Sequence, residues 1–397
     1  MRRYIRKTGL YIVGIIIIFF IGMSIFLVVQ FIQHPNEYVI RVLKWRDADV
    51  YDYQKFPERV LTASPALFFF PENRNEPYLH RVFREAASID DLDQMLRHTR
   101  TQAFIVIKSD TIIYEKYFTT AGRNSIVTSF SVAKSFASAL VGKAVEDGYI
   151  TSVDAPITRF LPELIERDRR FGDITIRHLI TMSSGIKYRE YPFGDDAKTY
   201  YYTDMRKLAL ERTRIQEVPG IRFHYNNYNP LLLGIILERA TGMTVTEYLQ
   251  KTIWDPLGME FPGSWSIDSE ESGFEKMESG INARAIDFAK FGRLYLHRGK
   301  WDGVQVLPPG WIDESTSPVS INDYDRYYPE RGIFSDGRGF YSLYWWGIQR
   351  DDGYDYAAVG NHGQYIYISP KSNLIIVRHG ERYGREGWLQ LFYSIAG

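Results

Sequence analysis

The longest apolar run of the chain lies at its amino end. Residues 8–33 contain no charged side chain, and about 20 apolar residues in a helix are enough to cross a bilayer. Basic residues precede this run, and no small-residue cleavage pattern is found ahead of His34. Because basic residues stay on the cytoplasmic side of a membrane, we expect an uncleaved single-pass anchor over residues 1–34, with the rest of the chain outside the cytoplasm. The basic residues are Arg2, Arg3, Arg6 and Lys7.

Beyond the anchor, the apolar periodicity changes twice along the chain. β-Branched runs in residues 102–118 predict a hairpin, and alternating runs in residues 364–369 and 374–379 predict a second strand pair. Between these regions, apolar residues recur at helical spacing. Helices are expected at 131–146, 175–182, 231–240 and 244–252, from an N-cap at Asn282 to about residue 296, and from about residue 386 to the end.

This order of elements predicts an α+β fold. Strands at both ends with helices between them indicate one discontinuous domain over residues 86–397, in which helices flank an antiparallel sheet. We assign the sheet part to residues 86–154 and 286–397, and a mainly helical insert to residues 155–285. Residues 35–85 have weak periodicity and are expected to form an irregular lead-in that packs on this domain.

Composition excludes several kinds of function. The formal net charge is zero, so no broad basic surface indicates a nucleic-acid partner. The chain has no cysteine, which excludes disulfides, thiolate metal sites and a cysteine nucleophile. The sequence also lacks the zinc-protease motif His-Glu-x-x-His and the α/β-hydrolase motif Gly-x-Ser-x-Gly. We therefore expect neither a metal nor a cofactor.

The strongest candidate chemistry lies at the start of the helix expected from residue 131. Ser131 and Lys134 are three residues apart and share a helix face, where an amine can take the proton of a hydroxyl. Lysine held among apolar residues loses solvation, so its pKa falls toward the range of a base. The helix N-terminus adds positive potential for an oxyanion. Ser184 and Lys187 have the same spacing, but they follow a helix and enclose Gly185. A Ser-His-Asp triad on Ser131 would leave Lys134 without a role.

The residues around Ser131 resemble a known family. The run Ser129–Phe136 resembles the nucleophile box of the penicillin-recognising serine hydrolases, which comprise serine β-lactamases, D-alanyl-D-alanine peptidases and related esterases and amidases. The resemblance is closest to the 6-aminohexanoate-dimer hydrolases, the nylon-oligomer amidases, and extends from Val42 to the end of the chain. The runs Trp45–Tyr53 and Ile176–Gly185 support it. It implies a β-lactamase/transpeptidase-like fold and an acyl-enzyme mechanism with Ser131 as the nucleophile.

A second box of that family, Tyr-x-Asn, is matched by Tyr225-Asn226-Asn227. A tyrosine near a lysine can share its proton and pass it to a leaving group, and the amide of Asn227 can hold Lys134 or a substrate carbonyl. Whether Lys134 or Tyr225 takes the first proton is left open. Tyr191 resembles a tyrosine of the amidase branch that contacts the substrate.

The third box departs from the Lys-Thr-Gly pattern of the family. Asn361-His362-Gly363-Gln364 occupies its place. Gly363 allows the backbone to approach a substrate closely, and the resemblance implies an oxyanion hole made by the backbone N–H groups of Ser131 and Gln364. His362 resembles the histidine of the nylon-oligomer branch.

Together these residues predict a membrane-anchored serine hydrolase that cleaves a small amide or ester through an acyl-enzyme on Ser131. The lysine of the family's third box helps to bind the carboxylate of β-lactams and of cell-wall peptides, so its absence disfavours both substrates unless Arg338 or Arg378 compensates. A D-alanyl-D-alanine peptidase or β-lactamase is the second alternative. The third is a catalytically inactive membrane receptor that keeps the pocket to bind a ligand, although a receptor need not retain all three boxes.

Overall fold

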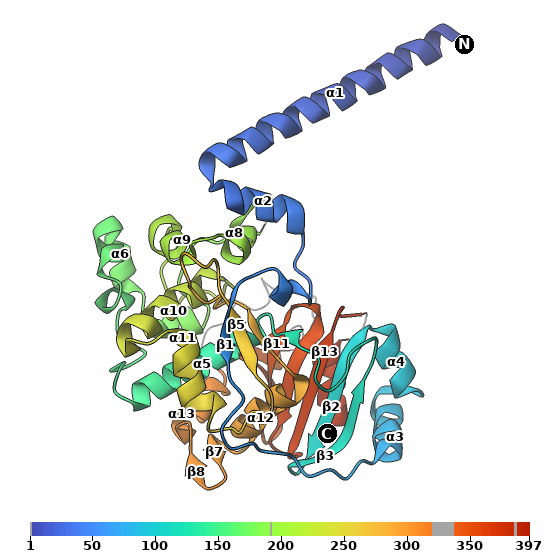
Figure 1. The fold of residues 1–397 in the computed structure, drawn as a ribbon, viewed down its shortest axis with the longest axis vertical. Helices are drawn as coiled ribbons and strands as arrows, with labels where there is room; N and C mark the ends of the chain where they lie inside the picture. The colour runs from blue at the N-terminus through green and yellow to red at the C-terminus, as the bar shows by residue number, and fades with distance from the viewer. Residues whose placement is uncertain (1, 191–192, 320–336, 385–386) are drawn as a thin grey trace.

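A computed structural model describes residues 2–190, 193–319, 337–384 and 387–397 of the protein. Helix α1 (Arg2–Gln33) projects away from the body of the molecule, and the other elements pack beneath it (Figure 1). Within the described residues, Tyr11–Gln33 is the one helical stretch long and apolar enough to cross a membrane. A signal sequence near an N-terminus would meet the same criteria of length and composition.

A seven-stranded antiparallel sheet joins the two ends of the folded domain. Its strand order is β3-β2-β13-β12-β11-β10-β9, so the early hairpin pairs directly with the last strand of the chain. Both strand pairs expected from the alternating pattern are present. The strands are β2 (Thr101–Lys108), β3 (Thr111–Tyr117), β9 (Gly339–Ser342), β10 (Trp345–Arg350), β11 (Gly353–Gly360), β12 (Gln364–Ser369) and β13 (Leu374–Gly380).

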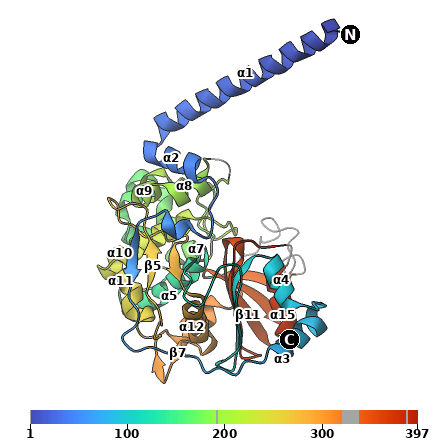
Figure 2. The same cartoon turned by 45° about the vertical axis from the view of Figure 1, so that its right-hand side comes forward.

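Helices cover both faces of this sheet (Figures 1 and 2). Successive side chains of a strand point to opposite faces, and β2 follows this rule. Phe104 and Val106 join the smaller hydrophobic cluster, which packs against the outer helices, whereas Ile105 and Ile107 join the larger cluster around the inner helices. The outer helices are α3 (Glu76–Ala87), α4 (Leu92–His98) and α15 (Trp388–Ile395), and the inner helices are α5 (Val132–Glu146) and α12 (Ala285–Leu296).

The middle of the chain is mainly helical, as expected, but it also contributes two strands to a second sheet of order β1-β5-β6-β4. Its helices are α6 (Pro162–Arg167), α7 (Ile176–Ile180), α8 (Asp195–Tyr201), α9 (Met205–Arg212), α10 (Tyr228–Thr241), α11 (Val245–Leu249) and the π-helical turn η4 (Gln250–Trp254). Its 3₁₀ turns are η2 (Ile157–Arg159) and η3 (Arg169–Asp173). The strands of the second sheet are β1 (Glu58–Leu61), β4 (Val127–Thr128), β5 (Gly263–Ser266) and β6 (Ile281–Ala283). Further elements are β7 (Lys300–Trp301), β8 (Val304–Gln305) and α13 (Pro309–Ser315).

The lead-in packs on the main domain, as expected, but it is only partly irregular. Residues 35–85 include α2 (Asn36–Trp45), the 3₁₀ turn η1 (Asp52–Gln54), β1 and most of α3, and residues 62–75 are largely irregular. Helix α2 buries Tyr38 and Val39 on one face and leaves Ile40 exposed on another. Charged and aromatic residues interrupt the apolar pattern of these short elements, so a test for long periodic runs does not detect them.

The expected N-cap at Asn282 was also wrong. Asn282 lies inside β6, and α12 begins three residues later. Its side-chain amide accepts a hydrogen bond from Thr128 and donates to Ser264 and Ser266. A buried amide must have partners, and the hydroxyls of the two adjacent strands supply them here instead of the N–H groups of a helix.

Candidate active site

Ser131 occupies the N-cap of α5, as the pattern predicted. Phe130 precedes it with a φ of +46°, a left-handed conformation that is uncommon for a residue with a side chain. Gly360, at the end of β11, packs against this turn, because a Cβ at that position would lie 2.3 Å from the carbonyl oxygen of Ser129. The Ser131 hydroxyl is thus held at a helix N-terminus beside the end of a sheet strand.

Lys134 lies one turn along α5 and contacts the serine directly. Its Nζ donates to Ser131 Oγ at 2.8 Å and to the backbone oxygen of Glu278 at 2.7 Å. The side chain is only 1% exposed. Burial lowers the pKa of Lys134 to about 7, although the charge of Glu278 acts in the opposite direction. Near neutral pH the amine therefore exchanges readily between its charged and neutral forms.

Tyr225 lies beside both Ser131 and Lys134. The Nζ of Lys134 is 4.9 Å from the centre of its ring, and the ring stacks on Trp346 at 5.9 Å. Burial raises the pKa of Tyr225, and a side-chain hydrogen bond with Ser131 opposes the rise. The structure thus brings Ser131, Lys134 and Tyr225 together, from residues almost a hundred positions apart in the chain.

The other residue of the second box faces the pocket without reaching the lysine. Asn227 Nδ2 donates to the hydroxyl of Tyr188 at 3.0 Å, and its buried Oδ1 has no hydrogen-bond partner among the described residues. Among the described residues, no hydrogen bond joins Asn227 to Lys134. Asn227 was expected to hold either Lys134 or a substrate carbonyl, and only the second role is compatible with this geometry. Tyr191 lies outside the described residues.

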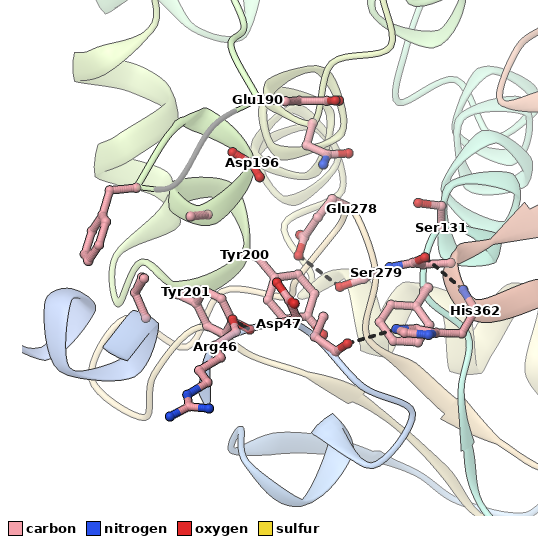
Figure 3. A pocket seen from close by; sticks show the side chains of 17 residues that line it. Arg46, Asp47, Ser131, Glu190, Asp196, Tyr200, Tyr201, Glu278, Ser279 and His362 are labelled. Carbon is pink, nitrogen blue, oxygen red and sulfur yellow. Dashed lines mark hydrogen bonds between the residues drawn. The ribbon is translucent and has the colours of Figure 1, made fainter. Parts of the chain in front are cut away.

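His362 lies at the rim of the pocket but its N–H is already used. It has a φ of +58° and packs its ring against Phe130 at 5.2 Å between centres. Its Nε2 lies 2.9 Å from the backbone oxygen of Ala48 (Figure 3). A carbonyl oxygen only accepts hydrogen bonds, so Nε2 carries the proton, and a neutral His362 has no second N–H for a substrate. The histidine therefore links the third box to the lead-in segment.

Buried side chains hold the rest of the third box in place. The 3₁₀ turn η6 (Asn361–Gly363) leads into β12, and the buried side chain of Gln364 hydrogen-bonds Gly380. Arg378 donates to the backbone oxygen of Gly363 at 2.6 Å and is fully buried beneath Trp388. Arg338 bonds Gln390 instead of lining the pocket. Neither arginine is placed to replace the missing lysine, which corrects that expectation.

A pocket of about 870 Å³ opens above Ser131 (Figure 3). Its described lining residues come from six separate segments of the chain, including the residues that follow α2. Among its described lining residues, four carry carboxylates and one, Arg46, carries a permanent positive charge. The carboxylates belong to Asp47, Glu190, Asp196 and Glu278. Sequence patterns did not indicate these residues, because no spacing rule connects segments so far apart. Within the described residues, no group of three or more His, Asp or Glu side chains could hold a metal.

Comparisons with known proteins agree with this architecture. The family model for β-lactamase matches residues 89–386. A 6-aminohexanoate-dimer hydrolase from Paenarthrobacter ureafaciens is 26% identical over 328 residues, covering 78% of this chain and 79% of the relative. Esterase EstB from Burkholderia gladioli is 28% identical over 211 residues, covering 47% of this chain and 53% of that esterase. A candidate 6-aminohexanoate-dimer hydrolase from Bacillus anthracis shares the fold, with a TM-score of 0.75 and 23% identity over 89% of this chain and 92% of that one. The expected resemblance and fold are thereby confirmed, and the chain belongs to the β-lactamase family.

Proposed function

We propose that the chain is a membrane-anchored serine hydrolase that cleaves a small amide or ester through an acyl-enzyme on Ser131. The observation that carries this proposal is the 2.8 Å contact between Lys134 Nζ and Ser131 Oγ in a site where burial lowers the pKa of the lysine to about 7. A neutral amine at that distance can take the hydroxyl proton as the oxygen attacks. The amidase and esterase among the relatives support the same reaction class.

The reaction proceeds in two balanced stages. Ser131 Oγ bonds to the substrate carbonyl carbon while its proton passes to Lys134 or Tyr225. By analogy with the family, we assign the stabilisation of the resulting oxyanion to the backbone N–H groups of Ser131 and Gln364. The C–N or C–O bond then breaks, and the leaving amine or alcohol takes up that proton. In the second stage water gives a proton to the same base and bonds to the acyl carbon. The bond between that carbon and Ser131 Oγ then breaks, the acid leaves, and Oγ takes up the proton.

The charge of the pocket favours this substrate class over β-lactams and cell-wall peptides. Those substrates carry a carboxylate, and the pocket offers four carboxylates and one rim arginine among its described lining residues. Arg378, which could have compensated, is occupied by backbone oxygens beneath the third box. A substrate without a negative charge therefore suits this pocket better.

The topology belongs to the same proposal. With Arg2, Arg3, Arg6 and Lys7 ahead of the apolar stretch of α1, the N-terminus would lie in the cytoplasm and the hydrolase domain outside it. Protease added outside intact cells should then cut the domain. Protection of the domain in sealed cells would contradict this orientation.

Covalent labelling of the purified full-length chain tests the chemistry. A fluorophosphonate probe should label the wild type, and Ser131→Ala should abolish both labelling and hydrolysis of p-nitrophenyl butyrate. Ser184→Ala is the matched control, because it removes the second Ser-x-x-Lys match, whose serine is buried and bonded to Asn229. Labelling that persists in Ser131→Ala would remove this serine from the mechanism.

A further inference from the structure

Helix α2 connects the apolar helix to the pocket. It begins at Asn36, three residues after α1 ends, and packs against α8 near the base of α1 (Figure 1). Its inner face is buried, whereas Ile40 and Leu43, three residues apart and so on a common helix face, are 51% and 44% exposed. The residues immediately after it, Arg46 and Asp47, line the pocket and are themselves exposed. The pocket therefore has part of its rim at the end of α2.

The length of α1 indicates where a bilayer would end. A helix rises about 1.5 Å per residue, so the apolar stretch Tyr11–Gln33 spans roughly 34 Å, slightly more than the thickness of a hydrocarbon core. The ring of Phe26 lies 5.5 Å from that of Phe193, and Phe193 lines the pocket. The end of the apolar stretch and the contact of Phe26 with Phe193 therefore put the headgroup level beside the pocket.

We propose that the exposed face of α2 lies in the outer headgroup layer of the membrane and that the pocket opens onto this layer, so that the substrate is a membrane-borne molecule whose ester or amide group lies there. This inference rests on the proposed anchor and the proposed hydrolase activity. The occupant of the apolar face of α2 is the bilayer that α1 would cross, because only two residues lie between α1 and α2. A substrate confined to that layer would meet the rim at Arg46 and Asp47 without leaving the membrane surface.

The test uses the full chain reconstituted in phosphatidylcholine/phosphatidylglycerol vesicles. Two fluorogenic esters with the same acyl group are compared: soluble 4-methylumbelliferyl butyrate, and an umbelliferyl butyrate linked to the headgroup of a dioleoyl phospholipid. The double variant Ile40→Asp/Leu43→Asp should lower the ratio of lipid-borne to soluble turnover by about tenfold or more. The membrane surface would bury the two aliphatic side chains, and charged carboxylates cannot take their place there. Soluble turnover should stay unchanged, since neither residue lines the pocket.

Val304→Asp is the matched control, because Val304 is 65% exposed on β8, at the opposite end of the molecule from α2 (Figure 1). It should leave the ratio unchanged. The membrane inference would be overturned if the ratio stayed the same in Ile40→Asp/Leu43→Asp, or if it fell equally in Val304→Asp. In either case, turnover of the soluble ester would still support the proposed hydrolase. If the wild type hydrolyses neither ester, the proposed hydrolase fails, and this inference fails with it.

A second inference concerns a buried ion pair behind the catalytic lysine. Lys276 is 1% exposed, and its Nζ lies 3.0 Å from Glu278 Oε1. Ser279 donates to the same oxygen at 2.9 Å, and Glu278 Oε2 has no partner among the described residues. The backbone oxygen of the same Glu278 accepts the hydrogen bond of Lys134. One residue thus joins the two lysines.

The two lysines face different surroundings. Lys134 faces Ser131, Tyr225 and Glu278. Lys276 faces Glu278, Tyr200 of α8, Asp52 of η1 and Arg41 of α2. Removing the positive charge of Lys276 would leave the Glu278 carboxylate uncompensated beside Lys134, and an uncompensated negative charge favours the protonated lysine. Protonated Lys134 cannot take a proton from Ser131.

We also propose that Lys276 is a positioning residue for the reaction, which holds the Glu278 carboxylate and prevents its charge from keeping Lys134 protonated. This inference, too, rests on the proposed function. It involves no contact between Lys276 and the substrate, since Lys276 does not line the pocket.

The pH profile of kcat/KM for soluble p-nitrophenyl butyrate tests it, with the full chain in detergent. The acid limb should move up by about one pH unit in Lys276→Met and down by a similar amount in Glu278→Gln. Lys276→Arg, which keeps the charge, should restore the wild-type limb. A structural role alone would lower kcat/KM by the same factor at every pH, and that result would overturn the inference. If Lys276→Met does not fold, the same pH profile is measured for Glu278→Gln and for the double variant Lys276→Met/Glu278→Gln. An acid limb at the wild-type pH in both variants would also overturn the inference.

Discussion

The floor and the outer wall of the pocket are built in opposite ways. Ser131 and Lys134 of the floor share the first turn of a buried helix and contact each other at 2.8 Å. The wall combines residues 42–48 with residue 190 and residues 193–201, which are far apart in the chain and include exposed charges. The floor thus depends on spacing within one helix, whereas the wall depends on distant segments that the fold brings together. Under the proposed function, the floor determines the reaction and the wall determines which molecules reach it.

The largest effect is expected in the floor. Lys134→Ala should lower kcat for p-nitrophenyl butyrate by about 10⁴-fold or more, nearly as much as Ser131→Ala, because groups that act as one unit are not additive. The double variant should be no worse than either single one. Steady-state kinetics of the three variants measures this. Independent, multiplying losses would show that the two residues do not act together.

The wall should discriminate among substrates by charge. A carboxylate loses a charge-assisted hydrogen bond worth about 1.5–3 kcal/mol when its cation is missing, which corresponds to roughly 10- to 150-fold in kcat/KM. Short acyl esters and small linear amides without a carboxylate should therefore be hydrolysed better than nitrocefin or a D-alanyl-D-alanine peptide. A higher kcat/KM for either of the last two would instead favour a cell-wall or β-lactam substrate.

A smaller effect, about tenfold per pH unit, should appear in the pH profile of the wild type. The base must be neutral, and burial lowers the pKa of Lys134 to about 7. The value of kcat/KM should therefore be constant above about pH 7 and fall as the pH drops below it, because the protonated amine accepts no proton. If Tyr225→Phe keeps this limb, Lys134 is the group that titrates. If the acid limb is absent from Tyr225→Phe, the titrating group is Tyr225.

The contrast between floor and wall also explains what the sequence could predict. The Ser131–Lys134 pair and the strand pair around residues 370–373 depend on local spacing, which a sequence displays directly. The contact of His362 with Ala48 and the ion pair of Lys276 with Glu278 depend on how the lead-in and the insert fold back over the floor. Nothing in local spacing encodes such contacts.

The smallest expected effect lies where floor and wall meet. His362 donates its N–H to the backbone oxygen of Ala48, so it ties the third box to the lead-in segment. A hydrogen bond of this kind contributes about 0.5–1.5 kcal/mol, and His362→Ala should therefore raise KM by roughly two- to tenfold. The value of kcat should change little, because the floor residues keep their contacts. His362→Asn, whose amide can also donate, should recover part of the loss. Separate measurement of kcat and KM tests this prediction. A fall of about 100-fold in kcat would show that His362 takes part in the chemical step, and His362 would then belong with the floor residues.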